Sequence, residues 1–348
     1  MKISILGGKD EIGGNKVLLE HKGTRVLLDF GMSFKQVSKY FCEFLQPRKG
    51  SALLDFFEFG LLPDIKGTYR PDYLKHSERP NEEKNIDAIF LSHAHVDHAQ
   101  YIHFLRHDIP VYCTKPTHII LKALEETGSG RCDDLVTCCE SFTFYQNTRG
   151  ELSRVTSRNI DYLKERTFNI MQAEKPVQIG SLKIEMVPVD HSLPGACAFI
   201  VHSDEGNLVY TGDIRFHGYH NDLSRKFVEK AKAASPRWLL CEGTRIKEKK
   251  GDSEEKVRKN ISKYISKAKG IVFVEHPIRD SDRVYTMFLA AKDNNREFVV
   301  NLKLAYLLEA LGELSPVKLD EVKIFIPRKS WGANNKRECL SKANRAGL

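Results

Sequence analysis

The sequence predicts a mixed α/β (α+β) fold in which two strand-rich halves pack sheet on sheet with helices outside, followed by a smaller parallel α/β unit. Three observations predict it. Short runs of β-branched and aliphatic residues, bounded by glycine turns, recur in two groups before residue 243. Stretches with apolar residues three and four positions apart lie between them. After residue 244, helix-like and strand-like stretches alternate.

The first group begins at the first residues of the chain. Glycine turns separate predicted strands at 2–6, 15–20, 24–30 and 86–91. Between 31 and 84, proline, glycine and charged residues predict a long insertion that runs over the surface. A helix over 97–106, a strand at 110–113 and a helix over 116–127 follow. A second insertion, over 128–175, shows no clear period.

The second group of strands is predicted at 182–189, 197–202, 207–210 and 237–242, with a helix over 222–233 before the last of them. A cap of the form Asp252-x-x-Glu255 then opens a helix. Beyond it, we predict a buried strand at 270–275, a helix over 281–292, a strand at 297–300, a helix over 303–311 and a strand at 322–326. The chain is therefore divided into residues 1–243 and 244–348.

Composition limits the class of protein. The chain has 348 residues, a net charge of +8 and no apolar run near the roughly 18 residues of a membrane helix. Its first residues do not read as a signal peptide, so we expect a cytoplasmic protein.

The eight cysteines form no Cys-x-x-Cys pair and are interpreted as reduced, mostly core residues; the cluster Cys132, Cys138 and Cys139 stays unassigned. Lys and Arg are concentrated over 245–269 and 321–348, as expected for a polyanionic partner or for solvated helix faces.

The most informative feature is the run from His93 to His98, which places three imidazoles and the carboxylate of Asp97 directly after a predicted buried strand. Imidazole and carboxylate groups are ligands that zinc prefers. Residues two apart point the same way at a strand end, so His93 and His95 can share one metal while Asp97 and His98 reach toward a second. The run predicts a two-metal site.

Three further candidates follow predicted strands: His191, Asp213 and Asp29. A carboxylate at Asp29 can orient a ligating imidazole from behind. Each of these residues alone is better explained as a turn residue or a cap. Their occurrence after three separate strands strengthens the set.

These motifs resemble those of the metallo-β-lactamase superfamily, whose fold is an αβ/βα sandwich. Longer strings resemble RNase J and its β-CASP nuclease relatives: Gly7 to Asn15, Val189 to Ala196, and Thr211-Gly212-Asp213-Ile214-Arg215. The segment Cys241-Glu242-Gly243-Thr244 resembles the acidic motif at the entry to a β-CASP domain. The resemblance implies a metallo-β-lactamase domain over 1–243 and a β-CASP-type domain over 244–348.

The resemblance also implies the chemistry. His93, His95 and His191 would hold one zinc ion, Asp97 and His98 a second, and Asp213 would bridge the two. A shared water, its pKa lowered toward about 7, would act as the hydroxide that hydrolyses RNA phosphodiester bonds. Asp97, Asp29 and Glu242 are the predicted catalytic residues. The basic segments over 149–166 and 245–269 would line the path of a single-stranded RNA, and the aromatic residues Phe142, Phe144 and Tyr145 could stack on its bases or pack in the core.

One departure limits these expectations. The family supplies further histidines late in the chain, and this sequence has no histidine after His276. Either the sequence is a fragment cut inside the β-CASP-type domain, which is the interpretation we favour, or the second metal site is incomplete. Two rival interpretations remain open: a small-molecule hydrolase of the same superfamily, and a catalytically weak nucleic-acid-binding subunit. Homodimer formation is left open as well.

Overall fold

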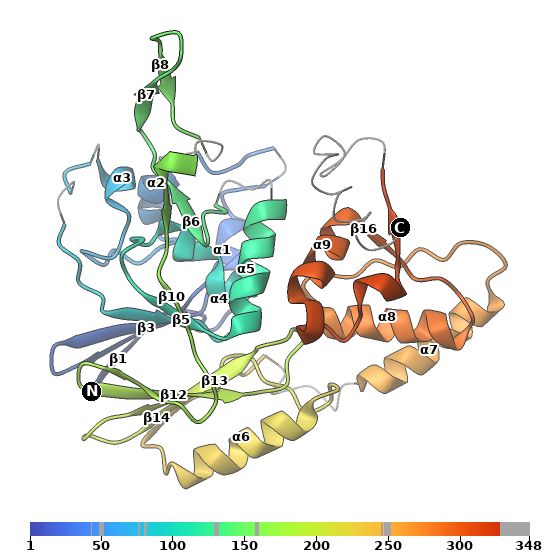
Figure 1. Cartoon of the computed structure of the whole chain (residues 1–348). Helices are drawn as coiled ribbons and strands as arrows, with labels where there is room; N and C mark the ends of the chain where they lie inside the picture. Colours follow the sequence, from blue (N-terminus) through green and yellow to red (C-terminus); the bar gives the residue numbers. More distant parts are fainter. Residues whose placement is uncertain are drawn as a thin grey trace.

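Two β-sheets pack face to face in the N-terminal part of the chain, and a smaller helical unit follows (Figure 1). The structure is a computed structural model that describes residues 1–42, 44–48, 52–75, 77–79, 82–128, 132–156, 160–244, 246 and 252–327. The predicted basic run over 321–348 and Cys339 therefore lie largely or wholly outside the described residues. In the described part, no helix is both long enough and apolar enough to cross a membrane.

The first sheet has the strand order β1-β2-β3-β4-β5-β10. Its first three strands form an antiparallel meander, whereas β3, β4, β5 and β10 run parallel. The strands are β1 (Lys2–Gly7), β2 (Lys16–His21), β3 (Thr24–Phe30), β4 (Ala88–Phe90), β5 (Val111–Cys113) and β10 (Phe168–Ile170). The end of the predicted second insertion thus contributes an edge strand to this sheet.

The second sheet has the order β11-β12-β13-β14-β15 and is antiparallel except for its last pair. Helix α6 (Asn221–Ala233) connects β14 to β15 and packs Phe227 on the outer face of this sheet. The strands are β11 (Val177–Ile179), β12 (Leu182–Pro188), β13 (Cys197–His202), β14 (Leu208–Tyr210) and β15 (Trp238–Leu240).

The apolar layer between the two sheets follows from the alternation of side chains along each strand. On β12, Leu182, Ile184 and Met186 are buried while Lys183 between them is exposed. They meet residues from β2, β3 and β4 in one cluster that includes Val17, Leu19, Val26, Leu28, Phe90 and Phe199. The sheet-on-sheet core predicted from the two strand groups is therefore present.

The outer face of the first sheet is covered by helices. They are α1 (Phe34–Val37), α2 (Ala52–Glu58), α3 (Pro71–Leu74), α4 (Val96–Ala99), η1 (Gln100–Phe104) and α5 (Lys115–Thr127). The predicted surface path of 31–84 is wrong for much of this segment, because Leu53, Phe56, Tyr69 and Leu74 are buried in the core. Their apolar side chains are separated by proline and charged residues, which hides them in a sequence pattern.

The elements after residue 252 are α7 (Glu254–Lys267), α8 (Ser281–Asp293), β16 (Val299–Asn301), α9 (Leu302–Leu311), η3 (Gly312–Leu314), η4 (Leu319–Glu321) and β17 (Lys323–Phe325). β16 and β17 are parallel, and α8 and α9 supply a separate apolar cluster around Phe288 and Leu304. Helix α7 is capped by Ser253, whose Oγ accepts from the N–H of Lys256, and not by Asp252 as predicted.

The predicted buried strand at 270–275 is wrong. These residues pair with no described strand and are exposed; Ile271 is 82% exposed and Phe273 is 91% exposed. β-branched and aromatic residues favour a strand, but such a preference depends on neighbours against which the side chains can pack.

Residues 132–166 form two small hairpin-like pairs outside the main sheets. β6 (Thr137–Cys139) pairs with β9 (Leu163–Glu165), which follows η2 (Ile160–Tyr162). β7 (Phe144–Gln146) pairs with β8 (Leu152–Arg154), and this hairpin projects from the body of the molecule (Figure 1). Phe144 on β7 is 57% exposed, so it does not pack in the core.

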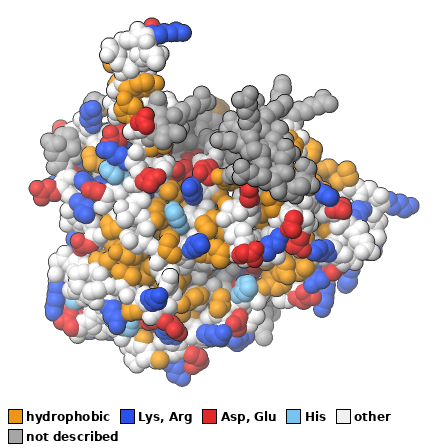
Figure 2. All heavy atoms as spheres, in the orientation of Figure 1, with side chains coloured by type: hydrophobic (Ala, Val, Ile, Leu, Met, Phe, Trp, Pro, Cys, Tyr) orange, Lys and Arg blue, Asp and Glu red, His pale blue; other side chains and the backbone are white. Residues whose placement is uncertain are grey.

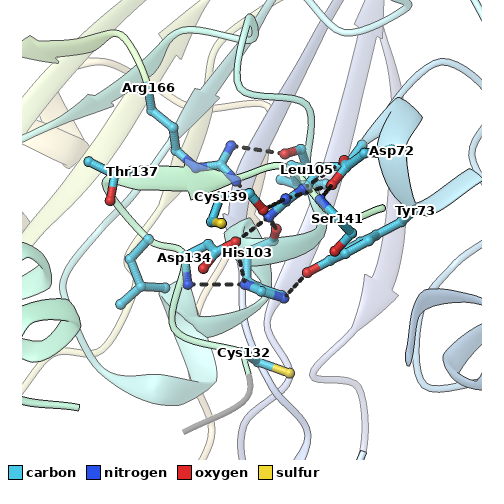
Figure 3. Close-up of polar contacts among 12 residues, drawn as sticks. Asp72, Tyr73, His103, Leu105, Cys132, Asp134, Thr137, Cys139, Ser141 and Arg166 are labelled. Carbon is cyan, nitrogen blue, oxygen red and sulfur yellow. Dashed lines mark hydrogen bonds and ion pairs between the residues drawn. The ribbon is translucent and has the colours of Figure 1, made fainter. Parts of the chain in front are cut away.

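A buried network of hydrogen bonds and ion pairs connects the segment that begins at residue 132 to the core (Figure 3). Arg70, which is 1% exposed, donates through Nη1 to Asp134 Oδ2 at 2.6 Å and through Nε and Nη2 to the carboxylate of Asp72 at 3.0 and 2.8 Å. His103 Nδ1 accepts from the Asp134 N–H at 3.0 Å, and its Nε2 lies 2.9 Å from the Tyr73 hydroxyl. The network therefore joins the segment to η1, directly after α4.

Arg166 belongs to the same buried region and corrects the predicted nucleic-acid lining. It is 4% exposed, and its Nη1 donates to the carbonyl oxygens of Leu105 at 2.9 Å and Arg106 at 3.0 Å. A guanidinium held in this way cannot contact RNA. In a polar segment without periodicity, nothing in the sequence distinguishes it from a solvated arginine.

We expect Arg70→Met to lower the free energy of unfolding by about 3–5 kcal/mol, because it leaves Asp134 and Asp72 without their buried cation. Urea unfolding followed by circular dichroism measures the change. Arg48→Met is the matched control, since Arg48 pairs with Asp55 at an exposed position and its loss should leave the free energy of unfolding nearly unchanged. Equal losses in the two variants would contradict this reading of the network.

Candidate metal centre

The predicted ligands gather where strands of both sheets end. The loop after β4 carries His93, and α4 begins at Val96 with His95 as its N-cap. His191 follows β12, and Asp213 follows β14. Because these loops leave neighbouring strand ends of facing sheets, side chains far apart in sequence come together.

One group consists of His93, His95, His191 and Asp213. The ring nitrogens His93 Nε2 and His191 Nε2 each lie 3.0 Å from His95 Nδ1. Asp213 Oδ2 lies 3.5 Å from His191 Nε2 and 3.9 Å from His93 Nε2. The four potential ligand atoms all lie within 4.8 Å of one another.

A second group consists of Asp97, His98 and Asp213. His98 Nε2 lies 3.1 Å from Asp213 Oδ1 and 3.7 Å from Asp97 Oδ2. Asp213 is common to both groups and turns one carboxylate oxygen toward each. Across the described ranges, these two groups are the sets of His, Cys, Asp or Glu compact enough for a metal, so Cys132, Cys138 and Cys139 form no such site.

The first group presents neutral imidazoles. Burial, together with the neighbouring imidazoles, lowers the pKa of His93 well below its usual value and that of His95 to about 3. Burial likewise lowers the pKa of His191 to about 4, although Asp213 opposes the shift. Two ring nitrogens 3.0 Å apart form a hydrogen bond only if one of them carries a proton. A single cation, in contrast, would accept lone pairs from all three imidazoles.

The second group favours positive charge. Burial works against a charged His98, but the carboxylates of Asp29 and Asp213 outweigh it and raise the pKa of His98 well above its usual value. Burial alone would raise the pKa of Asp213, yet His98 and the other imidazoles hold it below the usual range. An anionic Asp213 beside a position that favours a cation suits a divalent metal. The donor types of both groups therefore fit such an ion.

Asp29 supports His98 from the buried side. It is the penultimate residue of β3 and has φ +55°, a conformation that Asp and Asn tolerate better than most residues. Its Oδ2 lies 2.7 Å from His98 Nδ1 and accepts from the hydroxyls of Ser92 at 2.7 Å and Tyr210 at 2.6 Å. Its Oδ1 accepts from the Ser92 N–H at 2.7 Å. This arrangement fixes the ring of His98 with Nε2 facing Asp97 and Asp213.

The loop that precedes β2 packs against α4. Asn15 donates its N–H to the carbonyl oxygen of Asp97 at 3.0 Å, and its Nδ2 lies 3.0 Å from His98 Nε2. At Gly13, which has φ +83°, a Cβ atom would lie 2.7 Å from the Asp97 Cβ. Close approach of this loop to Asp97 therefore requires glycine.

Glu242 lies beside the centre and belongs to neither group. Its Oε1 accepts from the N–H of Ile214, directly after Asp213, at 2.7 Å. Burial raises the pKa of Glu242. This contact holds the loop that carries Asp213, and the predicted catalytic role of Glu242 stays a prediction.

Several residues at the centre were not identified from the sequence. Ser92 and Tyr210 contact Asp29, and Asn15 contacts His98. Ser92 and Tyr210 stand at strand ends next to predicted ligands, so their positions in the sequence could have identified them. Asn15 could have been identified only because the string from Gly7 onward resembles the family motif.

Comparisons with known proteins agree with the fold and the motifs. Residues 62–130 match the profile of a family described as the beta-lactamase superfamily domain. A crystal structure of a protein of unknown function from Enterococcus faecalis V583 superposes with a TM-score of 0.68 at 24% identity, covering 94% of this chain and 70% of that one. The chain has the metallo-β-lactamase fold with a further α/β part.

Curated relatives indicate a more specific group within this superfamily. Ribonuclease J of Pyrococcus abyssi is 27% identical over 267 residues, covering 75% of this chain and 49% of that protein. Ribonuclease J of Mycolicibacterium smegmatis is 26% identical over 300 residues, covering 84% and 42%. Transcription termination factor FttA of Methanocaldococcus jannaschii is 26% identical over 221 residues, covering 62% and 27%. The predicted resemblance to β-CASP nucleases is confirmed, and the chain spans about half or less of the length of these relatives.

Proposed function

We propose that the chain is a zinc-dependent hydrolase that cleaves phosphodiester bonds of RNA in RNA processing or decay. The observation that carries the proposal is the convergence of His93, His95, His191, Asp97, His98 and Asp213 into two groups that share Asp213. Likeness to Ribonuclease J supports RNA as the substrate class. A cytoplasmic location is part of the proposal.

The residues divide the work as follows. His93, His95 and His191 would hold one ion and Asp97 and His98 another, with Asp213 between them. Zinc bound there supplies Lewis acidity and a water that ionises near neutral pH. Asp97, whose pKa is raised by burial, would hold the ion through one carboxylate oxygen and orient the attacking water through the other. Asp29 holds His98 in place, and Glu242 holds the Asp213 loop.

The surface offers cations for a polyanion in two places. Arg149 and Arg154 are exposed on the β7–β8 hairpin, and Lys256, Lys259 and Lys263 are exposed on α7. Among the described side chains on the face drawn in Figure 2, however, positive and negative groups are interspersed and form no continuous basic stripe. We therefore propose that RNA is bound mainly by contacts near the candidate metal centre, and less by a long basic surface.

We expect the zinc-loaded chain to cleave an end-labelled single-stranded RNA, and His95→Ala and Asp97→Ala to abolish cleavage without unfolding. Both substitutions remove side chains from the candidate groups and leave the core clusters intact. Gel analysis of product lengths over time measures the activity and also reports exonuclease or endonuclease mode. Circular dichroism checks the fold.

The same experiment separates the alternatives. Hydrolysis of a lactam or thioester without RNA cleavage would favour a small-molecule hydrolase. RNA binding without cleavage, with one zinc ion or none per chain, would favour a binding subunit. A DNA oligonucleotide of the same sequence tests the preference for RNA, and unchanged cleavage by both variants would overturn the proposed mechanism.

A further inference from the structure

Arg279 reaches the candidate metal centre from the C-terminal part of the chain. It lies in the turn before α8, where Asp280 is the N-cap and accepts from the Arg283 N–H at 2.9 Å. The N–H of Asp282 donates to the carbonyl oxygen of Ser192 at 3.1 Å, which fixes the start of α8 beside His191. Arg279 Nη1 donates to the carbonyl oxygen of Ala94, between His93 and His95, at 3.2 Å.

The guanidinium of Arg279 has few hydrogen-bond and ion-pair partners in the described part of the chain. It is partly buried, and within the described ranges it forms no ion pair with a carboxylate inside 4.0 Å. Among the described residues, one of its five N–H donors has a partner, the Ala94 carbonyl oxygen. Burial lowers its pKa, while Asp133 and Asp97 act on it from a distance and favour its charge. Its own charge contributes to the lowered pKa of His95.

No carboxylate of the described part of the chain lies within ion-pair distance of this cation. Asp97 and Asp213 face His98, and the Ala94 carbonyl oxygen neutralises no charge. None of the Arg279 nitrogens is among the buried polar atoms that lack a partner, so its remaining donors are accessible, and an incoming anion would gain charge-assisted hydrogen bonds from them. The planar guanidinium matches two oxygens of one phosphate better than an ammonium does.

We propose that Arg279 binds non-bridging oxygens of the RNA phosphate at or next to the cleaved bond, and so couples the C-terminal part of the chain to the metal centre. The inference rests on the proposed function for its substrate class. It adds a contact from the C-terminal part of the chain, whereas all six candidate ligands lie between residues 93 and 213.

Arg279→Ala tests the proposal with two readouts. In metal-free protein kept in EDTA, fluorescence anisotropy over a salt series gives the affinity for a labelled single-stranded RNA. The slope of log affinity against log salt should become shallower by about 0.7, the value for one lost phosphate contact on a single strand. In the zinc-loaded protein, kcat/KM for the same RNA should fall on the order of 10²-fold, as for loss of one donor to the reacting group.

Two further variants sharpen the test. Arg225→Ala removes the same charge from an exposed position on α6 and should change neither readout. Arg279→Lys keeps the charge without the planar fork, so it should restore the salt slope and only part of kcat/KM. The zinc content and the melting temperature of Arg279→Ala should equal those of the wild type.

The outcomes are distinct. If the wild type cleaves RNA and Arg279→Ala matches Arg225→Ala in both readouts, the inference is overturned while the proposed function stands. A loss of zinc or stability in Arg279→Ala would also overturn it, since Arg279 would then act through the histidine loop. If the wild type neither binds nor cleaves RNA, the proposed function fails and takes the inference with it.

Discussion

Asp213→Ala should empty both candidate metal positions and lower the rate of RNA cleavage by more than about 10³-fold. Asp213 belongs to both groups of potential ligands, with one oxygen 3.1 Å from His98 Nε2 and the other 3.5 Å from His191 Nε2. Removing it takes negative charge from both positions at once. The loss should therefore exceed the roughly 10²–10³-fold typical of one stabilising donor.

Two measurements check this expectation: zinc content by atomic emission after dialysis, and kcat/KM on single-stranded RNA. The control is Asp204→Ala, which removes an exposed carboxylate paired with Lys22. That variant should keep its zinc and its activity. Two zinc ions per chain in Asp213→Ala would rule out a bridging role.

The candidate site was accessible to sequence reasoning because metal ligands need particular residue types at particular places. His93, His95 and Asp97 stand within five consecutive residues, and His191 and Asp213 follow recognisable strands. The structure brings all of them together. Their binding of metal stays a prediction.

Features that depend on tertiary partners could not be predicted. The run from Ile271 to Val274 has strong strand preference, yet it is exposed because no described strand lies beside it. Arg166 is polar in sequence and buried in the structure, where carbonyl oxygens of η1 and the residues after it accept from its two Nη groups. Arg279 stands in a turn whose position follows from the docking of α8 on Ser192. Sequence patterns carry no information on such contacts.

Asp29→Asn should lower both the stability of the metal-free protein and its affinity for zinc. The Asp29 carboxylate faces four donors: the His98 ring, the Ser92 N–H, and the hydroxyls of Ser92 and Tyr210. Asparagine fits the same volume and tolerates φ +55°, so backbone strain does not enter. Its amide nitrogen would meet hydrogen-bond donors, and His98 would lose a buried anionic partner. We expect a loss of about 3 kcal/mol in the free energy of unfolding.

The effect on zinc follows from the same contacts. With Asp29 as acceptor at Nδ1, His98 turns Nε2 toward Asp97 and Asp213. Without it, the ring is free to rotate or to carry its proton at Nε2, which should weaken zinc binding by about 10–100-fold. Urea unfolding in EDTA and competitive zinc titration measure the two effects separately. Asp87→Asn is the control, because Asp87 is exposed and accepts the Arg25 N–H on the same sheet. Wild-type zinc affinity in Asp29→Asn would show that His98 needs no support from Asp29, and the second candidate position would then rest on Asp97 and Asp213.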